Sequence, residues 1–322
     1  MKCKICKEET TIDIIDSYKH KWFFCNKCKN IFSEKKLNED SKLKKKLVHF
    51  ISKITNQSRI KKLLLNNDTS GNEFYNYTGD VPKDGGSHFP TKNSIYNKWS
   101  KFDEDFIKYL DDQNIDLNSK KILSVSDEPG LIVKKLEKYT PKKNITLTAF
   151  DEKTANLMTE KLNCKVLKYD LNNDFLSKIV DDNFDLIFFR STLNFNLDFN
   201  SLLNEIDKIS NKNTKIVFNF HAPTTASCFM WMFDDYTLLS LINIDFLLPL
   251  FIKKNFKIIF SKKVIFNPRG YYYNSLSKKL FYYPFYFFYL SKHFLKSMFN
   301  KNEIKVSKNE IAYKLILKKN HI

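Results

Sequence analysis

From residue 121 onward, short runs of apolar residues alternate with longer amphipathic stretches. The short runs have the length of strands, and the longer stretches place apolar residues at helical spacing. The predicted strands cover 122–125, 145–150, 166–169, 184–189, 216–220 and 311–317, and the predicted helices cover 131–139, 155–162 and 202–209. Strands that alternate with helices predict an α/β fold, in which a mostly parallel sheet carries helices on both faces.

Four cysteines near the start of the chain form two C-x-x-C pairs. Cys3 and Cys6 make the first pair, and Cys25 and Cys28 follow after a spacer long enough for a hairpin. This spacing is typical of a zinc site with four thiolate ligands, which leaves no open position for catalysis, so we predict a small ribbon with a structural Zn²⁺. Two disulfides are the alternative, and a reducing compartment disfavours them.

The residues between the ribbon and the sheet predict a connection of two kinds. A lysine-rich stretch at 35–62 has apolar residues at helical spacing, and 66–91 is rich in glycine and proline, which indicates a loop. A further amphipathic helix is predicted at 95–110. We therefore divide the chain into a ribbon at 1–34, a helical connection and loop at 35–100, and a sheet domain at 101–322.

The charge of the chain is large, positive and unevenly distributed. The net charge is +18 at pH 7, with +9 in residues 1–70, −5 in residues 71–250 and +14 in residues 251–322. Two basic ends indicate an anionic partner, such as a membrane surface or a phosphorylated substrate. Nucleic acid is disfavoured as a partner, because nearly all of the positive charge is lysine and arginine is the better ligand for phosphates and bases.

The start of the chain and its most apolar stretch both indicate a cytoplasmic protein. The polar residues after Met1 do not form the apolar segment of a signal peptide. The stretch at 238–252 is interrupted by Asn243, Asp245 and Pro249, and it falls short of the roughly 20 residues that span a bilayer. We predict a buried helix there.

Each predicted parallel strand is followed by polar residues suited to hold a ligand. In strand order these are the turn that contains Ser124, Ser126 and Gly130, then Asp151, then Asp170, then Arg190 with Asn194, and finally His221. The carboxyl ends of parallel strands lie at one edge of the sheet, where ligands of such folds bind. The sequence thus predicts a binding site at this edge.

The order and spacing of these pieces resemble the class I S-adenosylmethionine-dependent methyltransferases. In that family, an acidic residue that ends the second strand holds the ribose hydroxyls of the cofactor, and another after the third strand lies near the adenine. The resemblance implies these two roles for Asp151 and Asp170. It also implies a Rossmann-like sheet, S-adenosylmethionine as the cofactor and methyl transfer as the activity.

The turn after the first strand corresponds to the D-x-G-x-G-x-G turn of the family and departs from it. Ser124, Ser126, Glu128 and Gly130 stand where the family has the acid and three small positions, so the acid and two glycines are missing. Glycine in such a turn lets the backbone approach the methionine part of the cofactor. The resemblance implies cofactor-binding roles for Ser124, Ser126 and Gly130, and Arg190 joins them from the end of the fourth strand.

The second half of the cysteine motif, at 25–32, is similar to the zinc ribbon that precedes methyltransferase domains encoded with sugar and cell-surface polysaccharide pathways. This resemblance covers nearly the whole chain. It implies a small acceptor that is sugar-linked or nucleotide-activated, or part of a glycan.

A methyl transfer of this kind needs a base near the reacting atoms. His221 is the predicted base, because an imidazole with a pKa near 6.5 titrates close to neutral pH. A histidine hydrogen-bonded to a neighbouring loop is the alternative. Arg190 and Asn194 are candidates to orient the substrate, and His88 joins them from the glycine-rich loop.

A basic and aromatic insertion at 268–306 precedes the last strand. Pro284 is expected to divide it into two short helices, of which the second is amphipathic. One interpretation is that the insertion covers the substrate site. The other is that 275–299 rests on an anionic membrane surface, which would place the protein at the periphery of the inner membrane face.

Three functions stay open on the sequence. The first is methyl transfer to a small sugar-linked or nucleotide-activated acceptor, whose phosphates would suit the basic ends. The second is an RNA methyltransferase, and the third is a non-catalytic zinc-ribbon protein with a degenerate methyltransferase fold. Binding of the cofactor separates the third function from the other two, and salt-dependent binding of RNA separates the second from the first.

Overall fold

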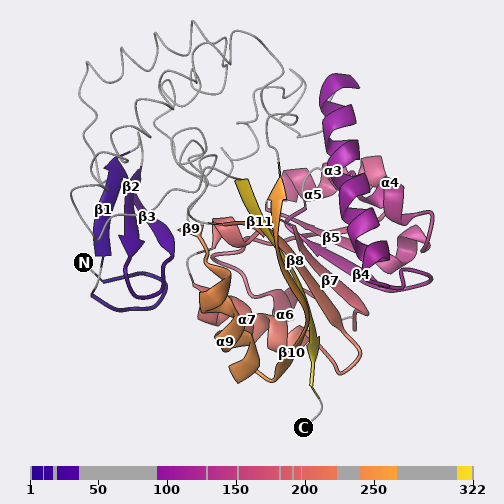
Figure 1. Ribbon diagram of the computed structural model, residues 1–322. Coiled ribbons are helices and arrows are strands. Elements are labelled where there is room, and N and C mark those ends of the chain that lie inside the picture. The colour runs from indigo at the N-terminus through magenta and orange to yellow at the C-terminus, as the bar shows by residue number, and fades with distance from the viewer. Residues whose placement is uncertain are drawn as a thin grey trace, which may run out of the picture.

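The computed structural model contains a seven-stranded sheet and a smaller four-stranded sheet (Figure 1). It describes residues 2–9, 11–16, 20–35, 93–127, 130–150, 152–180, 183–190, 192–196, 198–222, 240–266 and 310–320. The predicted helix within 35–62, the loop at 66–91 and the insertion at 268–306 with Pro284 lie outside the described residues.

The larger sheet is mostly parallel, as the sequence predicts. Its parallel strands are β4 (Ile122–Val125), β5 (Ile145–Ala149), β6 (Lys165–Lys168), β7 (Leu186–Arg190) and β8 (Lys215–His221). The strand order is β10-β11-β8-β7-β4-β5-β6, in which β11 (Glu310–Lys319) runs antiparallel to both of its neighbours. The strand β10 (Phe256–Phe266) was not among the predicted elements. The predicted Rossmann-like α/β fold is confirmed.

Helices cover both faces of this sheet (Figure 1). One face carries α3 (Asn93–Asp112), α4 (Val133–Leu136) and α5 (Glu152–Leu162), and the other carries α6 (Leu176–Ile179), α7 (Phe199–Ile209) and α9 (Ile244–Lys253). The helices predicted at 95–110, 155–162 and 202–209 are present. The helix predicted at 131–139 is shorter, because tighter i→i+3 turns flank α4 on both sides.

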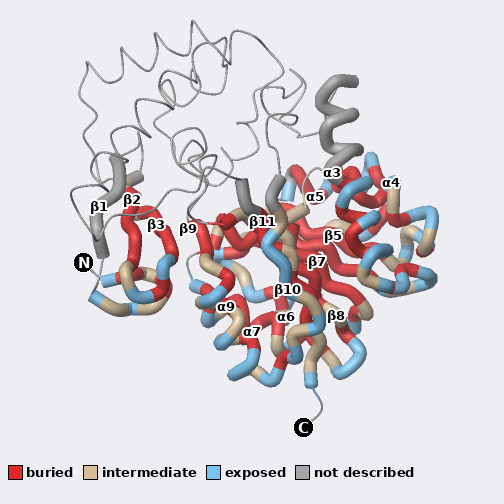
Figure 2. The backbone as a smooth tube through the Cα atoms, viewed as in Figure 1, coloured by how far each residue is buried: buried red, intermediate tan, exposed pale blue. Residues whose placement is uncertain are grey.

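The core consists of two layers, because successive residues of a strand point to opposite faces of the sheet. Figure 2 shows the central strands β5 and β7 as buried. In β7, Ile187 and Phe189 pack in the layer of α7, whereas Leu186 and Phe188 pack in the layer of α3. Every residue of β4, β5 and β7 is buried. Burial on both faces explains why these strands have continuous apolar runs in the sequence rather than alternating ones.

The smaller sheet is the predicted ribbon with one addition. The strands β1 (Thr11–Asp16), β2 (His20–Cys25) and β3 (Ile31–Lys35) pair in antiparallel order, and β9 (Ser240–Leu241) extends the sheet at β3. The prediction of one helix across 238–252 is therefore wrong at its start. The helix α9 begins only at Ile244, because the Asn243 side chain accepts a hydrogen bond from the Asp245 backbone N–H (3.1 Å) and so caps it.

The ribbon and the sheet domain share one apolar core. Phe23 and Phe32 of the ribbon belong to the same cluster of buried residues as Leu193 and Ile242 of the sheet domain. The helix α3 begins at Asn93, within the segment assigned to the connection at 35–100, and packs on the large sheet. None of the helices in these described ranges is long and apolar enough to cross a membrane.

Gly130 lies where the turn after β4 leads into α4. Its φ is +72°, and a Cβ built there would meet side-chain carbons of Leu147, Met158 and Leu162 at 2.7–2.8 Å. Ser126, at the other end of the same turn, also has a positive φ (+48°). A larger residue at this position would therefore be strained and would have to displace side chains of β5 and α5, and the cofactor-binding role that the resemblance implies for Gly130 stays a prediction.

We expect Gly130→Ala to lower the free energy of unfolding by about 2–4 kcal/mol, because it adds left-handed strain and overpacks the α5 side of the core. Ser126→Gly is the matched control. This substitution relieves left-handed backbone strain at Ser126 and introduces no clash, whereas the greater flexibility of glycine in the unfolded chain opposes the gain. We therefore expect it to raise the free energy of unfolding by between zero and about 1 kcal/mol. Urea unfolding followed by far-UV circular dichroism measures both changes, and equal effects of the two substitutions would contradict the packing role of Gly130.

Candidate functional site

The strand order reverses between β4 and β7. From β4 the chain continues outward through β5 and β6, and from β7 it continues through β8 in the opposite direction. Parallel sheets bind ligands outside the carboxyl ends of their strands at such a reversal. Ser126 and Asp127 lie there after β4, Arg190 ends β7 and His221 ends β8. Of the residues that the sequence singles out, the structure therefore places Ser126, Arg190 and His221 at the ends of the neighbouring strands β4, β7 and β8.

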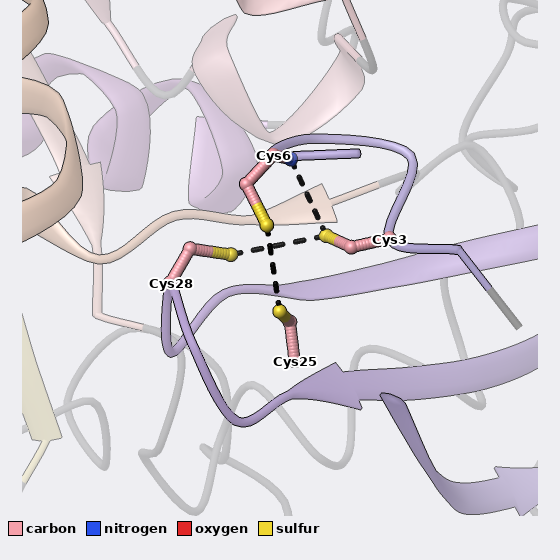
Figure 3. Close-up of side chains that lie close together, drawn as sticks. All are labelled: Cys3, Cys6, Cys25 and Cys28. Atoms are coloured by element: carbon pink, nitrogen blue, oxygen red, sulfur yellow. Dashed lines mark hydrogen bonds between the residues drawn. The ribbon is translucent and has the colours of Figure 1, made fainter. Parts of the chain in front are cut away.

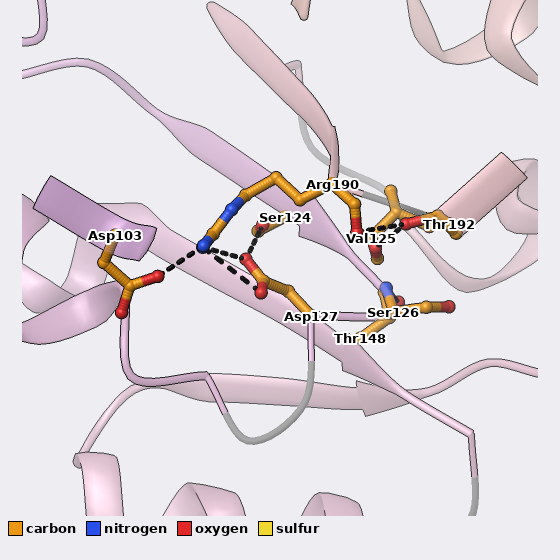
Figure 4. Close-up of polar contacts among 8 residues, drawn as sticks. All are labelled: Asp103, Ser124, Val125, Ser126, Asp127, Thr148, Arg190 and Thr192. Atoms are coloured by element: carbon orange, nitrogen blue, oxygen red, sulfur yellow. Dashed lines mark hydrogen bonds and ion pairs between the residues drawn. The ribbon is translucent and has the colours of Figure 1, made fainter. Parts of the chain in front are cut away.

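The turn after β4 is held by hydrogen bonds from three sides (Figure 4). The Ser126 backbone N–H donates to Thr148 Oγ1 of β5 (2.8 Å), and Thr192 Oγ1 donates to the carbonyl oxygen of Val125 (2.9 Å). Ser124 Oγ, which is fully buried, donates to Asp127 Oδ2 (2.5 Å). Side-chain hydrogen bonds thus hold this turn in place, whereas the methyltransferase family that the sequence resembles has glycines at the corresponding positions.

A buried ion triad lies beside this turn. The Arg190 guanidinium donates through Nη1 to both carboxylate oxygens of Asp127 (3.2 and 2.9 Å) and through Nη2 to Asp103 Oδ1 of α3. The side chains of Arg190 and Asp103 are 2% and 3% exposed, and the guanidinium carbon lies 4.9 Å from the ring centroid of Phe106. Figure 4 shows the guanidinium between the two carboxylates. The Arg190 guanidinium thus joins α3 to the turn, and its role toward a ligand stays a prediction.

The triad holds two carboxylates and one guanidinium. Burial raises the pKa of Asp103 to about 6, although the charge of Arg190 opposes this shift. Burial lowers the pKa of Arg190, but the charges of Asp127 and Asp103 outweigh this effect and raise it overall. The triad has one more carboxylate than guanidinium, so its formal net charge is negative.

Asp170 follows β6 and organises a second turn. Its Oδ1 accepts a hydrogen bond from the backbone N–H of Asn172 (3.0 Å), and its Oδ2 accepts one from Asn173 Nδ2 (2.6 Å). Asn172 Nδ2 in turn donates to the carbonyl oxygen of Phe195 (2.8 Å). The half-buried Asp170 thus stands at the end of its strand, and its turn is connected to the segment after β7.

His221 and Asn194 have environments that the sequence does not reveal. His221 is half-buried at the end of β8, and burial lowers its pKa to about 4, below the value near 6.5 expected for a base. The imidazole is therefore neutral at pH 7. Asn194 is 3% exposed, and its Nδ2 donates to the carbonyl oxygen of Ser240 in β9 (3.1 Å). This amide holds the strand that joins the ribbon. His88 and Asp151 lie outside the described residues.

The four cysteines of the ribbon converge as predicted (Figure 3). All four sulfur atoms lie within 4.8 Å of one another, with Cys3 Sγ and Cys28 Sγ 3.8 Å apart and Cys6 Sγ and Cys25 Sγ 3.6 Å apart. A disulfide would need about 2.05 Å between two sulfurs, whereas the edge of a tetrahedron around an ion with bonds of about 2.3 Å is close to 3.8 Å. The cluster therefore has the shape of a four-thiolate metal site.

Sequence reasoning missed the partners of Arg190. Asp103 lies four residues after Trp99 and three before Phe106, so it falls on the apolar face of a helix, where an acid needs a cationic partner. An acidic residue on the apolar face of this helix was therefore the one feature of the sequence that indicated a buried ion pair. Thr148 and Thr192 gave no such signal, because a buried threonine in a strand or turn has no special pattern.

No family model matches this chain, and no curated protein matches it. Among solved structures, the chain is similar to a candidate sarcosine dimethylglycine methyltransferase from Galdieria sulphuraria (TM-score 0.48, 10% identity, 71% of this chain and 91% of that chain). It is also similar to the magnesium protoporphyrin IX methyltransferase of Synechocystis PCC 6803 with bound SAH (TM-score 0.45, 8% identity, 86% and 100%). A third is an S-adenosylmethionine-dependent methyltransferase from Mesorhizobium loti (TM-score 0.44, 12% identity, 66% and 96%).

At these identities and TM-scores, the solved structures tell nothing about the cofactor or the substrate of this chain. Its own residues define a class of protein: a doubly wound α/β domain with a candidate ligand-binding edge, to which a four-cysteine ribbon is joined through β9.

We expect Arg190→Met to lower the free energy of unfolding by about 3–5 kcal/mol, because it leaves two buried carboxylates without their cation. The loss should shrink below about pH 6, where Asp103 takes up a proton more readily. Lys135→Met is the control, because it breaks the Lys135–Glu104 pair between α4 and α3, which is largely exposed on the glutamate side, and should cost about 1 kcal/mol or less. Urea unfolding at pH 7 and pH 5 measures both variants, and similar losses would show that the triad contributes no more than a surface pair.

Proposed function

We propose that this chain is an S-adenosylmethionine-dependent methyltransferase that acts on a small acceptor, sugar-linked or nucleotide-activated. The observation that carries the proposal is the braced turn after β4, which lies at the strand-order reversal on the same edge as Asp170 and His221. The sequence resemblance assigns the methionine part of the cofactor to this turn, the ribose to Asp151 and the adenine side to Asp170.

The charge at this edge fits the cofactor. The triad of Asp103, Arg190 and Asp127 has a negative formal net charge, and Asp103 Oδ2 is buried and accepts no hydrogen bond from the described residues. Because two carboxylates share one guanidinium, one negative charge of the triad is not neutralised, and such a charge in a poorly solvated place favours a nearby cation. S-adenosylmethionine carries a sulfonium and an ammonium group.

The chain's residues would position the acceptor and remove its proton, and the bound cofactor would supply an electrophilic methyl group. Rigid positioning of the reactants contributes much of the rate in such a reaction. The hydrogen bonds around Ser126 and Asp127 hold the turn after β4 in one conformation, so that it can position a ligand. His221 is neutral at pH 7 and can accept a proton, and with a pKa of about 4 it is a weak base. This favours an acceptor whose hydroxyl or amine is already acidic or becomes so as the bond forms.

The acceptor class rests on charge and on the resemblance to sugar-pathway proteins. Phosphates of a nucleotide-activated or lipid-linked sugar would complement the basic ends of the chain. In this proposal the protein acts in the cytoplasm, and the aromatic and basic segment at 275–299 contacts the anionic inner membrane face.

A non-catalytic protein with this fold is the second candidate, and one observation favours it. The polar side chains of the first turn already bond within the protein, since Asp127 accepts from both Ser124 and Arg190. A turn whose acceptors are satisfied in this way has fewer groups left for a cofactor.

We also propose that Cys3, Cys6, Cys25 and Cys28 hold a structural Zn²⁺. Tetrahedral sulfur ligands at this spacing suit zinc, and a coordination shell of four thiolates is closed to substrate. A ribbon of this size buries too little apolar surface to fold alone, so the ion would contribute to its folding.

Asp151→Ala should weaken binding of S-adenosylmethionine by roughly 10- to 100-fold, because a hydrogen bond to a charged group contributes about 1.5–3 kcal/mol. Asp111→Ala, which removes an exposed carboxylate of α3, is the matched control and should leave the affinity unchanged. Isothermal titration calorimetry at up to millimolar cofactor measures both. If the wild-type chain binds no cofactor in this range, the methyltransferase proposal fails and the non-catalytic candidate replaces it.

Purified protein should contain zinc in a ratio of about one ion per chain, and Cys25→Ser should lose most of the metal together with thermal stability. Cys164→Ala is the control, because Cys164 is buried between α5 and β6 and lies outside the cluster. Elemental analysis and thermal unfolding measure the two variants. Metal-free protein with the four sulfurs oxidised to disulfides would refute the zinc site.

A further inference from the structure

The ribbon is attached next to the candidate ligand-binding edge. The two residues of β9 pair with β3 of the ribbon, with Ile31 opposite Leu241 and Phe32 opposite Ser240. On its other side β9 contacts η3 (Thr192–Phe195), the short helix that follows β7 and Arg190. A single two-residue strand thus lies between the ribbon and the segment after β7.

Ser240 joins β9 to η3 by hydrogen bonds in both directions. Its Oγ lies within donating distance of the carbonyl oxygens of Asn196 (2.6 Å) and Leu193 (3.2 Å), and its own carbonyl oxygen accepts from Asn194 Nδ2 (3.1 Å). Ser240 is fully buried, and Asn194 and Asn196 are 3% and 2% exposed. Buried polar contacts of this kind fix one arrangement of two segments, because any other arrangement leaves polar groups unpaired.

On the ribbon side, the contacts lead directly to the second cysteine pair. The Asn243 backbone N–H donates to Asn30 Oδ1 (2.7 Å), and the Asn30 carbonyl oxygen accepts from the Cys25 backbone N–H (3.0 Å). Asn30 is fully buried and follows Cys28 by two residues. The turn that presents Cys25 and Cys28 is therefore held against the segment that contains β9.

On the sheet side, η3 is bonded to the end of β4 and to the turn after β6. Thr192 Oγ1 donates to the carbonyl oxygen of Val125 at the end of β4, and the carbonyl oxygen of Phe195 accepts from Asn172 in the turn after β6. A change in the position of η3 would therefore change the turn after β4 and the turn that holds Asp170.

We propose that the four-cysteine ribbon is a clamp on the ligand-binding edge, with Ser240 and Asn194 as positioning residues that fix η3. In this role the metal acts on the site from a distance, and its loss or oxidation of the thiols loosens η3. The proposal depends on the proposed function in one respect only: it takes the edge next to η3 to be the site of methyl transfer.

Hydrogen exchange followed by mass spectrometry tests the clamp on the full-length, metal-loaded chain. In Ser240→Ala, amides of residues 192–196 should exchange roughly 10-fold faster than in the wild type, because the hydrogen bond that the Ser240 hydroxyl donates to this segment is lost. Ser33→Ala is the matched control: Ser33 is 1% exposed on the neighbouring strand β3, and no described residue forms a hydrogen bond with its Oγ. It should leave residues 192–196 unchanged.

The helix α5, on the opposite face of the sheet, reports whether each variant is folded, and its exchange should stay constant. If Ser240→Ala does not fold, Asn194→Ala takes its place, because it removes the hydrogen bond from Asn194 Nδ2 to the Ser240 carbonyl oxygen in the same contact. Removal of the metal from the wild type with a chelator should accelerate exchange at 192–196 in the same way. Unchanged exchange at 192–196 in the folded variant and in metal-free protein would overturn the clamp.

A cofactor titration separates this proposal from the proposed function. If the wild type binds S-adenosylmethionine, Ser240→Ala should weaken the affinity, whereas Ser33→Ala should not, and equal affinities would limit the clamp to η3 itself and overturn its role at the site. If the wild type binds no cofactor, the methyltransferase proposal fails, and the exchange measurement still decides whether the ribbon holds η3.

Discussion

The buried guanidinium of Arg190 organises the candidate ligand-binding edge of the sheet. Arg190 connects α3, through Asp103, to the turn after β4, through Asp127. A buried charge must be paired, so these elements cannot separate without a large loss of free energy. The hydrogen bonds of Ser124 and Ser126 then depend on where this ion triad holds the turn. The buried ion triad is therefore the cause of both the rigid geometry and the net negative charge at this edge.

The ribbon packs against the sheet domain next to this edge and is not joined to it by the chain alone. Buried apolar residues of the ribbon continue into the core layer of α7 and α9, and polar residues such as Ser240 and Asn30 fix the relative position of the two parts. Apolar packing supplies most of the stability of such a junction, whereas the hydrogen bonds select one register. In the proposed role, the four-cysteine cluster would influence the candidate binding site through this junction, without contact with a ligand.

Much of the fold could be predicted because its signal is local. Central strands that are buried on both faces give continuous apolar runs, and α7 repeats its apolar residues at helical spacing. The strand β10 was missed because its edge position mixes lysines with apolar residues, as at Lys257 and Ile259, so neither period stands out. The two residues of β9 are too few for any period, and only their pairing with β3 makes them a strand.

The cysteine cluster, the parallel sheet and the set of residues that follow its strands could be predicted from the sequence, because each depends on short spacings or on one-dimensional patterns. The partners of those residues follow only from the folded chain. Arg190 meets carboxylates 63 and 87 positions away, Asn194 bonds to a strand 46 positions away, and Gly130 is required by side chains of β5 and α5. These partners depend on burial, because a buried polar group needs a hydrogen-bond partner and a close-packed interior leaves no room for an extra atom. Which residues fill these roles depends on what the folded chain brings next to each position.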